Sequence, residues 1–404
     1  MCGGVIYYGF TAFFNPIMDE FGWSATELSF AFSLRGLESG LLAPVIGFLT
    51  DRLGVRKVTV FGWAVAGLGF ILTSRAHSLW AFYGAFALLS LGGSCGISTP
   101  YVAVANWFAR KRTWVMALMS TGFAFSGAMG PVLVWLINQY GWRDALFILG
   151  IAIWVVGAPL GLVLRHRPEP YGYLPDGGRT TPTQTGSPEA STPTVTPPPL
   201  TGLTTRQALA TRAFWMLFIF GVLSGFVQSA LNVHEMPYLV SIGISRQLAG
   251  WVILGITGFS LIGRLGFGWA GDIYDKRYLL AIGAVLQLLG TFIFAYLSHP
   301  WMLLPFLLLY GPGYASQIPL YPAIRADLFG LKNYATIGGL VAMSWTICGI
   351  VAPLLAGWVF DVTGSYRPIW LAYAIASAVA IPFVLMIKRQ EGISKSQADA
   401  LPAN

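Results

Sequence analysis

Residues 251–272 read WVILGITGFSLIGRLGFGWAGD. A run of about 20 apolar residues is long enough to cross a bilayer as a helix. The one basic side chain in this run is Arg264. An arginine at membrane depth costs roughly 2.5–3.5 kcal/mol on insertion scales, so it must face protein, water or an anion. We therefore expect Arg264 to hold the carboxylate of a small organic anion.

The rest of the chain has the same membrane-like composition. Of its 404 residues, 55% are hydrophobic and only 10% are charged, whereas soluble chains carry about 25% charge. Apolar runs recur from end to end, which predicts an all-α membrane protein with twelve transmembrane helices in two six-helix bundles. The expected spans are 2–19, 25–49, 57–75, 79–105, 113–138, 144–164, 212–239, 246–271, 278–297, 300–324, 334–359 and 367–387.

Basic residues predict how the chain is oriented. Eighteen of the 24 Lys and Arg residues fall in loops after even-numbered spans or in the C-terminal tail, and four fall in the opposite loops. Arg325 is counted among the eighteen, as a loop residue after span 300–324. Because cytoplasmic loops carry the excess of basic residues, we expect both termini to be cytoplasmic and the protein to lie in the cell (inner) membrane.

A Pro-, Thr- and Ser-rich stretch divides the chain. Its composition cannot bury a core, so it predicts a flexible linker between two halves. The expected organisation is an N-terminal bundle at 1–164, a cytoplasmic linker at 165–206, a C-terminal bundle at 207–391 and a tail at 392–404.

The two halves repeat one another at a constant offset of 221 residues. The pattern Gly47-x3-Asp51 recurs as Gly268-x3-Asp272. Pro16, Gly22 and Ser24 recur at the same offset as Pro237, Gly243 and Ser245. Parallel repeats of six spans place a substrate site at their interface, near the middle of the membrane.

Several other classes of protein are disfavoured. The sequence contains no GxxxxGK[ST] phosphate-binding loop, no nucleophile–base arrangement and no cluster of metal ligands, so we expect no enzyme, no metal and no cofactor. The net charge of +8 lies between apolar runs and indicates membrane topology instead of nucleic-acid binding. No motif implies an accessory subunit, and we expect a monomer in the lipid bilayer whose transport is driven by a gradient.

The loop after the second span is the most specific motif. Residues 47–57 read GFLTDRLGVRK, and this resembles the G-x3-D-R-x-G-R-R loop of the major facilitator superfamily. We expect Gly47 to let helices approach closely and Asp51 to cap a neighbouring helix, where its charge meets the helix dipole. We expect Arg52, and Asp272 in the second copy of the motif, to help gate and orient the helices as well. This motif gives no information about the substrate.

Three further segments resemble the monocarboxylate transporter and oxalate/formate antiporter branches of that superfamily. Arg264 falls where those families keep an arginine that binds the substrate carboxylate. The chain departs from animal monocarboxylate transporters at Ser260, where they carry an acid, and near Asn15, where they carry a lysine. It departs from oxalate antiporters because 334–359 contains no basic residue. One cation in the site favours a monocarboxylate such as lactate or pyruvate. The three segments are NWFARKR at 106–112, RPEPYGYLPDG at 167–177 and LFGLKNYATIGG at 328–339.

The repeat supports a role for Arg264 in binding the substrate. Its counterpart in the first half is Ala43, so the scaffold does not require an arginine at this place. A guanidinium can grip a carboxylate with two parallel hydrogen bonds. The alternative is that Arg264 only reaches toward the membrane surface or pairs with Asp272.

Two groups are candidates for carrying a proton with the anion. Arg35 and Glu38 are three residues apart and share a helix face, which predicts a structural ion pair or, for Glu38, a part in proton coupling. His234 precedes the helix-bending Pro237 and titrates near neutral pH. It is a proton acceptor or a gate residue that only forms hydrogen bonds.

The superfamily resemblance implies a cavity between the two bundles. A lactate-sized ligand needs one cation, one or two polar partners and an apolar wall. A residue of each of these types is more often a plain helix-packing residue than a ligand-binding one, and Tyr101 and Asn15 are the preferred pair. The expected substrate-binding residues besides Arg264 are Tyr101, Asn15, Asn232, Gln317, Tyr321, Ser344 and Phe123.

Three functions therefore remain open. The favoured one is proton-coupled transport of a monocarboxylate by alternating access. The second is exchange of carboxylates, such as oxalate for formate. The third is export of uncharged compounds or a sensor that does not transport, in which case Arg264 would not contact the ligand.

Overall fold

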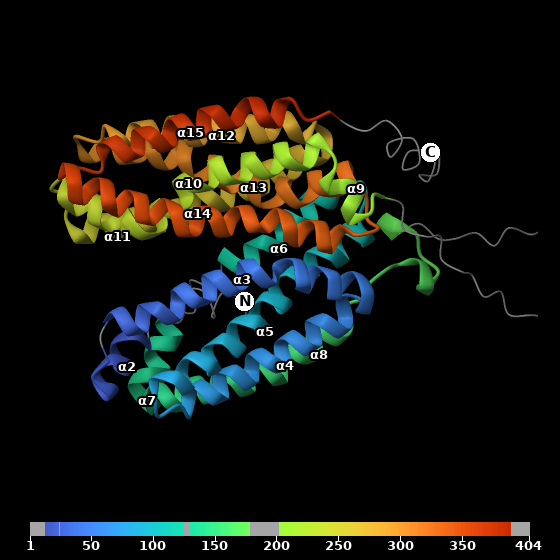
Figure 1. Cartoon of the computed structure of the whole chain (residues 1–404), viewed down its shortest axis with the longest axis horizontal. Helices are drawn as coiled ribbons and strands as arrows, with labels where there is room; N and C mark the ends of the chain where they lie inside the picture. The colour runs from blue at the N-terminus through green and yellow to red at the C-terminus, as the bar shows by residue number, and fades with distance from the viewer. Residues whose placement is uncertain (1–12, 24, 125–129, 178–201, 389–404) are drawn as a thin grey trace, which may run out of the picture.

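The computed structural model describes residues 13–23, 25–124, 130–177 and 202–388. Most of this part of the chain is helical, and an isolated β-bridge joins Gly202 and Gly330. Helices α2–α8 gather in one bundle and α10–α15 in a second bundle beside it (Figure 1). In the described part, eight helices are long and apolar enough to cross a membrane. The predicted all-α membrane fold with two bundles is confirmed.

The N-terminal bundle follows the predicted spans closely. Gly141, at φ 79°, breaks α7 and so separates the predicted spans 113–138 and 144–164. Most of the first predicted span, 2–19, lies outside the described residues. The elements are α2 (Phe14–Phe21), α3 (Ala25–Leu53), α4 (Val55–Ser74), α5 (Leu79–Trp107), α6 (Arg112–Ala124), α7 (Gly130–Ala152), a π-helical turn η3 (Ile153–Gly157) and α8 (Ala158–Val163).

The C-terminal bundle corrects one sequence-based assignment. Helix α13 continues to Phe329, so Arg325 lies in this helix and not in the loop after it. The helix continues because apolar Ala326, Leu328 and Phe329 still have neighbours to pack against and are buried. The elements are α9 (Thr205–Leu209), α10 (Arg212–Ser241), α11 (Arg246–Ile273), α12 (Lys276–Ala295), α13 (Leu303–Phe329), α14 (Tyr334–Thr363) and α15 (Arg367–Leu385).

Glycines allow the same close helix contact in each bundle. A Cβ at Gly62 of α4 would lie 2.9 Å from the carbonyl oxygen of Gly92 on α5. A Cβ at Gly283 of α12 would lie 3.2 Å from the carbonyl oxygen of Gly313 on α13. The two pairs are 221 residues apart, so the sequence repeat is a repeat of contacts. Small residues suit membrane helix interfaces because they let backbones approach closely.

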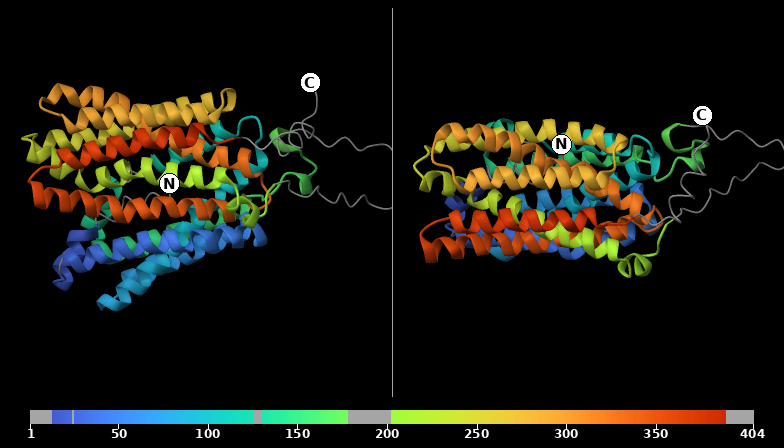
Figure 2. Two further views of the ribbon diagram at one scale, coloured as in Figure 1. Left: turned by 45° about the horizontal axis from the view of Figure 1, so that its top comes forward. Right: turned by 90° about the horizontal axis from the view of Figure 1, so that it is seen from above.

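The two bundles meet through two helix pairs. Helix α3 packs against α14, and α6 packs against α11. These pairs are also related by the repeat, because α11 and α14 are the second-half counterparts of α3 and α6. We call the end where α3, α5, α11 and α13 finish the linker end, because the segments on either side of 178–201 lie there (Figures 1 and 2).

The first part of the predicted linker is held against the N-terminal bundle. The carbonyl oxygen of His166 accepts a hydrogen bond from Asn106 Nδ2 at 2.8 Å. Asp176 accepts from the backbone amides of Ala109 and Arg110 at 3.1 and 2.9 Å, just before α6 begins. These contacts tie the residues after α8 to the ends of α5 and α6.

Candidate functional site

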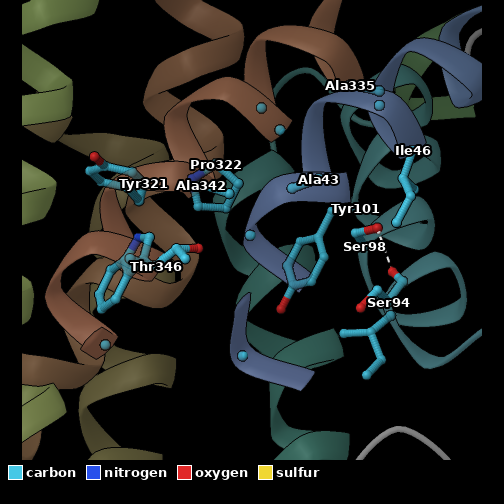
Figure 3. A pocket seen from close by; sticks show the side chains of 18 of the residues that line it. Ala43, Ile46, Ser94, Ser98, Tyr101, Tyr321, Pro322, Ala335, Ala342 and Thr346 are labelled. Atoms are coloured by element: carbon cyan, nitrogen blue, oxygen red, sulfur yellow. Dashed lines mark hydrogen bonds between the residues drawn. The ribbon is translucent and has the colours of Figure 1, made fainter. Parts of the chain in front are cut away.

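A cavity of about 1080 Å³ lies between the two bundles. Its walls come from α3 and α5 on one side and from α13 and α14 on the other. Figure 3 shows Ala43 and Ile46 of α3 and Tyr101 of α5 opposite Tyr321 and Pro322 of α13. The volume is comparable to pockets that hold drug-sized ligands, which cover about 300–1,000 Å³. It is therefore the candidate substrate path.

The cavity wall is mostly apolar and carries little charge. Glycines at 36, 40, 47, 338, 339 and 349 form part of it, together with aliphatic side chains. Among the described lining residues, Arg325 is the one charged side chain. An apolar wall with a few polar groups is typical of sites for small molecules.

Gln317 lines this cavity, and both ends of its amide are already hydrogen-bonded within the C-terminal bundle. Its Nε2 donates to Gln287 Oε1 at 2.9 Å, and its Oε1 accepts from Ser224 Oγ at 3.2 Å. Gln287 Nε2 in turn donates to the Ser224 carbonyl oxygen at 2.9 Å. All three side chains are buried. The network joins α10, α12 and α13, so Gln317 has a structural role here whatever its contact with a ligand.

Tyr321 and Ser344 turn their hydroxyl groups toward α10. Tyr321 donates to the Leu217 carbonyl oxygen at 2.6 Å, and Ser344 donates to the Val341 carbonyl oxygen at 2.7 Å. A Cβ placed on Gly221 of α10 would collide with both hydroxyls. Tyr321 therefore offers the cavity its ring, and Ser344 is not among the residues that line it.

Arg264 is buried at the contact between α11 and α6. Its side chain is 5% exposed, and Nη1 donates to the Ser120 carbonyl oxygen at 2.8 Å. Its Nε has no hydrogen-bond partner. Asp272 does not pair with it, because the Asp272 carboxylate accepts amide hydrogen bonds from the start of α6. Arg264 is not among the residues that line the cavity.

The proton-carrying candidates lie in different surroundings. Both ring nitrogens of His234 are engaged, with Tyr366 Oη at 3.1 Å and with the Pro353 carbonyl oxygen at 2.9 Å. Glu38 is half-buried, and its Oε2 has no partner. Neither residue lines the cavity.

Asn232 is not among the residues that line the cavity. Asn232 is exposed on α10. The side chains of Asn15, Phe123 and Arg35 lie outside the described part of the structure, although their backbones belong to α2, α6 and α3. Of the expected substrate-binding set, the structure brings Tyr101, Gln317 and Tyr321 together around the cavity.

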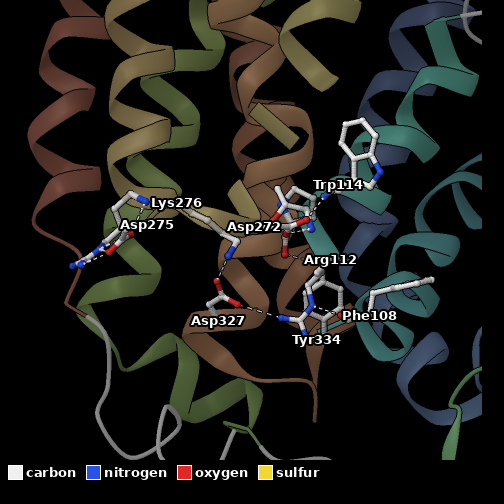
Figure 4. Close-up of polar contacts among 11 residues, drawn as sticks. Phe108, Arg112, Trp114, Asp272, Asp275, Lys276, Asp327 and Tyr334 are labelled. Atoms are coloured by element: carbon white, nitrogen blue, oxygen red, sulfur yellow. Dashed lines mark hydrogen bonds and ion pairs between the residues drawn. The ribbon is translucent and has the colours of Figure 1, made fainter. Parts of the chain in front are cut away.

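Two aspartates join the bundles at the linker end. Asp51 of α3 accepts from the backbone amides of Ala335 and Thr336, at 3.1 and 2.8 Å, where α14 begins. Asp272 of α11 accepts from the amides of Thr113 and Trp114, at 2.8 and 2.9 Å, where α6 begins (Figure 4). Each carboxylate faces the positive end of a helix dipole in the other bundle.

The glycines that precede these aspartates make the contact possible. A Cβ on Gly47 would collide with the Ala335 carbonyl oxygen, and a Cβ on Gly268 would collide with Ala117. Ionic contacts add to this closure, since Asp327 pairs with Arg112 at 3.2 Å and with Lys276 at 2.7 Å (Figure 4). Arg52 instead stacks over Phe48 of its own helix, 4.8 Å from the ring centroid.

Polar contacts between the bundles are unevenly distributed. Among the described residues, the hydrogen bonds and ion pairs that join them lie at the linker end, except that from Arg264 to Ser120. The structure is therefore closed by polar contacts at the linker end of the cavity.

Two chemically notable residues were not singled out from the sequence. Arg325 was placed in a loop, although the apolar residues after it indicate that the helix continues. Glu235 is buried on α10, and its Oε1 has no partner. The signal in the sequence that could have identified Glu235 is its place as a lone acid within an apolar run. In the described part, no group of His, Cys, Asp and Glu could hold a metal ion.

Comparison with known proteins identifies the family that has this architecture. The Major Facilitator Superfamily model matches residues 1–241 and 235–402. The chain belongs to the major facilitator superfamily. Members of this superfamily are transporters and not enzymes, so this chain is a multi-pass membrane transporter.

Relatives with known names are similar over most of this major facilitator chain. Monocarboxylate transporter 12 of Mus musculus is 26% identical over 97% of this chain and 84% of its own length. Monocarboxylate transporter 7 of Homo sapiens is 23% identical over 94% of this chain and 82% of its own.

Solved structures agree with the fold. The Escherichia coli fucose:proton symporter has a TM-score of 0.72 at 14% identity and covers 96% of this chain and 98% of its own. A proton:xylose symporter has a TM-score of 0.76 at 13% identity and covers 99% and 97%. At these identities the likeness shows the fold alone.

Proposed function

We propose that this transporter carries a small monocarboxylate, of the size of lactate or pyruvate, across the cell (inner) membrane together with a proton. The observation that carries the proposal is Arg264. It is a buried guanidinium at the contact between the two bundles, where a substrate of this fold would sit.

The hydrogen bonds of Arg264 leave capacity for a ligand. A guanidinium has five N–H donors. Its Nη1 donates to a backbone carbonyl oxygen, and its Nε is unpartnered. A buried cation without a carboxylate partner is costly. An incoming carboxylate would supply the missing charge and accept two parallel hydrogen bonds.

The similarity to named relatives supports the same class of substrate. Those relatives are called monocarboxylate transporters, at 23–26% identity over most of the chain. Tyr101 provides a hydroxyl on the wall of the cavity. A cation, a hydroxyl and an apolar wall match the needs of a short carboxylic acid.

We propose that the halves 1–164 and 207–391 rock about the central cavity, with the linker end facing the cytoplasm. The excess of Lys and Arg in loops at this end supports the orientation, with both termini cytoplasmic. The contacts of Asp51 and Asp272 would then close the cytoplasmic side in this state. During transport these contacts would break, and the protein would change to the arrangement in which the cavity is open at the linker end.

For the proton, we favour Glu38 over His234. His234 already has both ring nitrogens engaged inside the C-terminal bundle, whereas the Oε2 atom of the half-buried Glu38 has no partner. A carboxyl group at membrane depth is an accepted form of proton carrier in transporters.

Uptake into proteoliposomes tests the proposal. Labelled L-lactate and pyruvate should enter faster when a proton gradient points inward. Arg264→Gln should reduce uptake at least about 100-fold, because an uncharged amide cannot replace the guanidinium. Arg264→Lys should restore part of it, since a lysine keeps the charge but loses the paired geometry. Arg110→Gln, at an exposed arginine, is the matched control.

Two results would contradict the proposal. Trans-stimulated exchange that ignores the proton gradient would show a carboxylate exchanger. Ligand binding that survives Arg264→Gln would show a transporter of uncharged compounds or a sensor.

A further inference from the structure

Arg325 lies on the wall of the cavity, about one turn before α13 ends. Its neighbours along the wall are Tyr321 and Pro322 of the same helix and Tyr334 of α14. The guanidinium carbon is 5.2 Å from the centre of the Tyr334 ring, which holds the planar group by a cation–π contact.

Gly338 provides the space for this guanidinium. A Cβ on Gly338 would collide with Arg325 Nη1. Any other residue at this position would push the side chain away from the place it occupies. The pair of Arg325 and Gly338 is therefore a built feature of the linker end of the cavity.

The charge of Arg325 is not balanced by a carboxylate among the described residues. The nearest acid in sequence, Asp327, already pairs with Arg112 and Lys276. Asp51 accepts hydrogen bonds from the start of α14. Arg325 Nε is buried without a partner, and Nη2 donates a long hydrogen bond, 3.5 Å, to Tyr334 Oη.

Tyr101 of α5 lines the same cavity as Arg325. Arg264 is not among the lining residues, whereas Arg325 is.

We propose that Arg325 is a second carboxylate-binding group of the transport path, at the linker end of the cavity. This inference rests on the proposed function, because it assumes that the substrate is a carboxylate. The substrate carboxylate passes between Arg264 and Arg325 during transport. No bond is made or broken, and the anion exchanges one set of N–H donors for another.

Arginine-directed labelling of the full-length protein in nanodiscs provides the first test. Phenylglyoxal modifies accessible guanidinium groups, and peptide mass spectrometry reads the modification at residue 325. We expect Arg325 to be modified in the wild type and protected by sodium L-lactate or pyruvate, but not by equal concentrations of glycerol. Exposed Arg206 of α9 should be modified to the same extent with and without the acids.

Variants provide the second test. Arg325→Gln should raise the half-saturating concentration of L-lactate at least about tenfold, and Arg325→Lys should restore part of the affinity. Arg206→Gln should leave it unchanged. Gly338→Ala keeps the charge but displaces the guanidinium, so it should weaken binding even if Arg325→Gln does not fold.

The outcomes separate this inference from the proposed function. If L-lactate binding depends on Arg264 but Arg325 is neither protected nor needed, the second group is disproved and the proposed function stands. If Arg325→Gln weakens only a dicarboxylate such as malonate, Arg325 is not a station for a monocarboxylate and the inference is wrong. If no carboxylic acid binds the wild type, the proposed function fails first and takes the inference with it.

Discussion

Thr336, at the start of α14, donates two hydrogen bonds to Asp51 Oδ2 on α3, from its amide at 2.8 Å and from its hydroxyl at 2.6 Å. The two residues belong to different bundles. A charged cap at a helix N-terminus contributes about 0.3–1 kcal/mol, and up to about 2 kcal/mol when it is partly buried. This contact therefore favours the closed linker end by a small and adjustable amount.

Asp51→Asn should open the linker end. The amide keeps part of the cap but loses the charge, so we expect a loss of about 1 kcal/mol and a shift of about fivefold in the ratio of closed to open molecules. Spin labels at Arg56→Cys and Lys332→Cys, both exposed on different bundles, would report the distance distribution. Thr336→Val should have a smaller effect because the amide remains. An unchanged distribution in Asp51→Asn, as in the exposed control Asp19→Asn, would contradict the prediction.

Gly268→Ala should destabilise the contact between α11 and α6. The new methyl group would collide with Ala117, and overpacking of this kind costs about 1–3 kcal/mol. Gly266→Ala, two residues earlier on the same helix, meets nothing within 4 Å and should be neutral or stabilising by about 0.5–1 kcal/mol. Thermal unfolding in detergent would compare the two. Equal melting temperatures would show that the close approach at Gly268 does not matter for stability.

Gln287→Leu should destabilise the C-terminal bundle. It removes the acceptor for Gln317 Nε2 and leaves a buried donor unpaired, which costs about 1–3 kcal/mol. The double variant Gln287→Leu with Gln317→Leu should recover part of this loss, since no orphaned amide remains and Ser224 still donates to Phe220. A double variant that is less stable than the sum of the singles would argue against this account.

His166 should make stability depend on pH. Burial, and then the neighbouring charge of Arg167, lowers the pKa of His166 from 6.5 to about 4. Its Nδ1 accepts from the Val55 amide at 3.5 Å only when that nitrogen is deprotonated. As the pH falls from 6.5 toward 4, the unfolded chain binds a proton that the folded chain resists, so stability present above pH 6.5 is lost.

The size of this effect is expected to be modest. The ring is only partly buried, and solvent screening reduces the electrostatic part. Between pH 7.5 and 5, the melting temperature of the wild type should fall by roughly 2–4 °C more than that of His166→Gln, the range that about 1 kcal/mol produces in a domain of 150–250 residues. Parallel curves for the two proteins would exclude His166 as the source.

Local patterns were sufficient for the architecture. Apolar runs predicted the helices because a bilayer requires about 20 apolar residues per span. The offset of 221 residues between Gly47-x3-Asp51 and Gly268-x3-Asp272 predicted two related halves. Both follow from chemistry within a few residues of each position, so no knowledge of distant contacts was needed.

The side chains that line the cavity could not be predicted from local sequence patterns. Gln317 was a candidate ligand residue until its amide was found between Gln287 and Ser224, which come from two other helices. Arg325 was counted as a loop charge. Because α13 continues to Phe329, Arg325 lies on this helix, and it is the one charged group among the described lining residues. Which face a side chain presents depends on the neighbours that pack around it.

The sequence by itself determined that this chain is a membrane-spanning, pseudo-symmetric protein with a costly arginine at position 264, because length, apolarity and repetition can be read along the chain. Only the tertiary structure decided that Arg264 is hydrogen-bonded to Ser120 of the other bundle and is not among the residues that line the cavity, whereas Arg325 is. The physical reason is that the surroundings of a buried charge are set by helices far apart in the chain, which come together only when the two bundles pack.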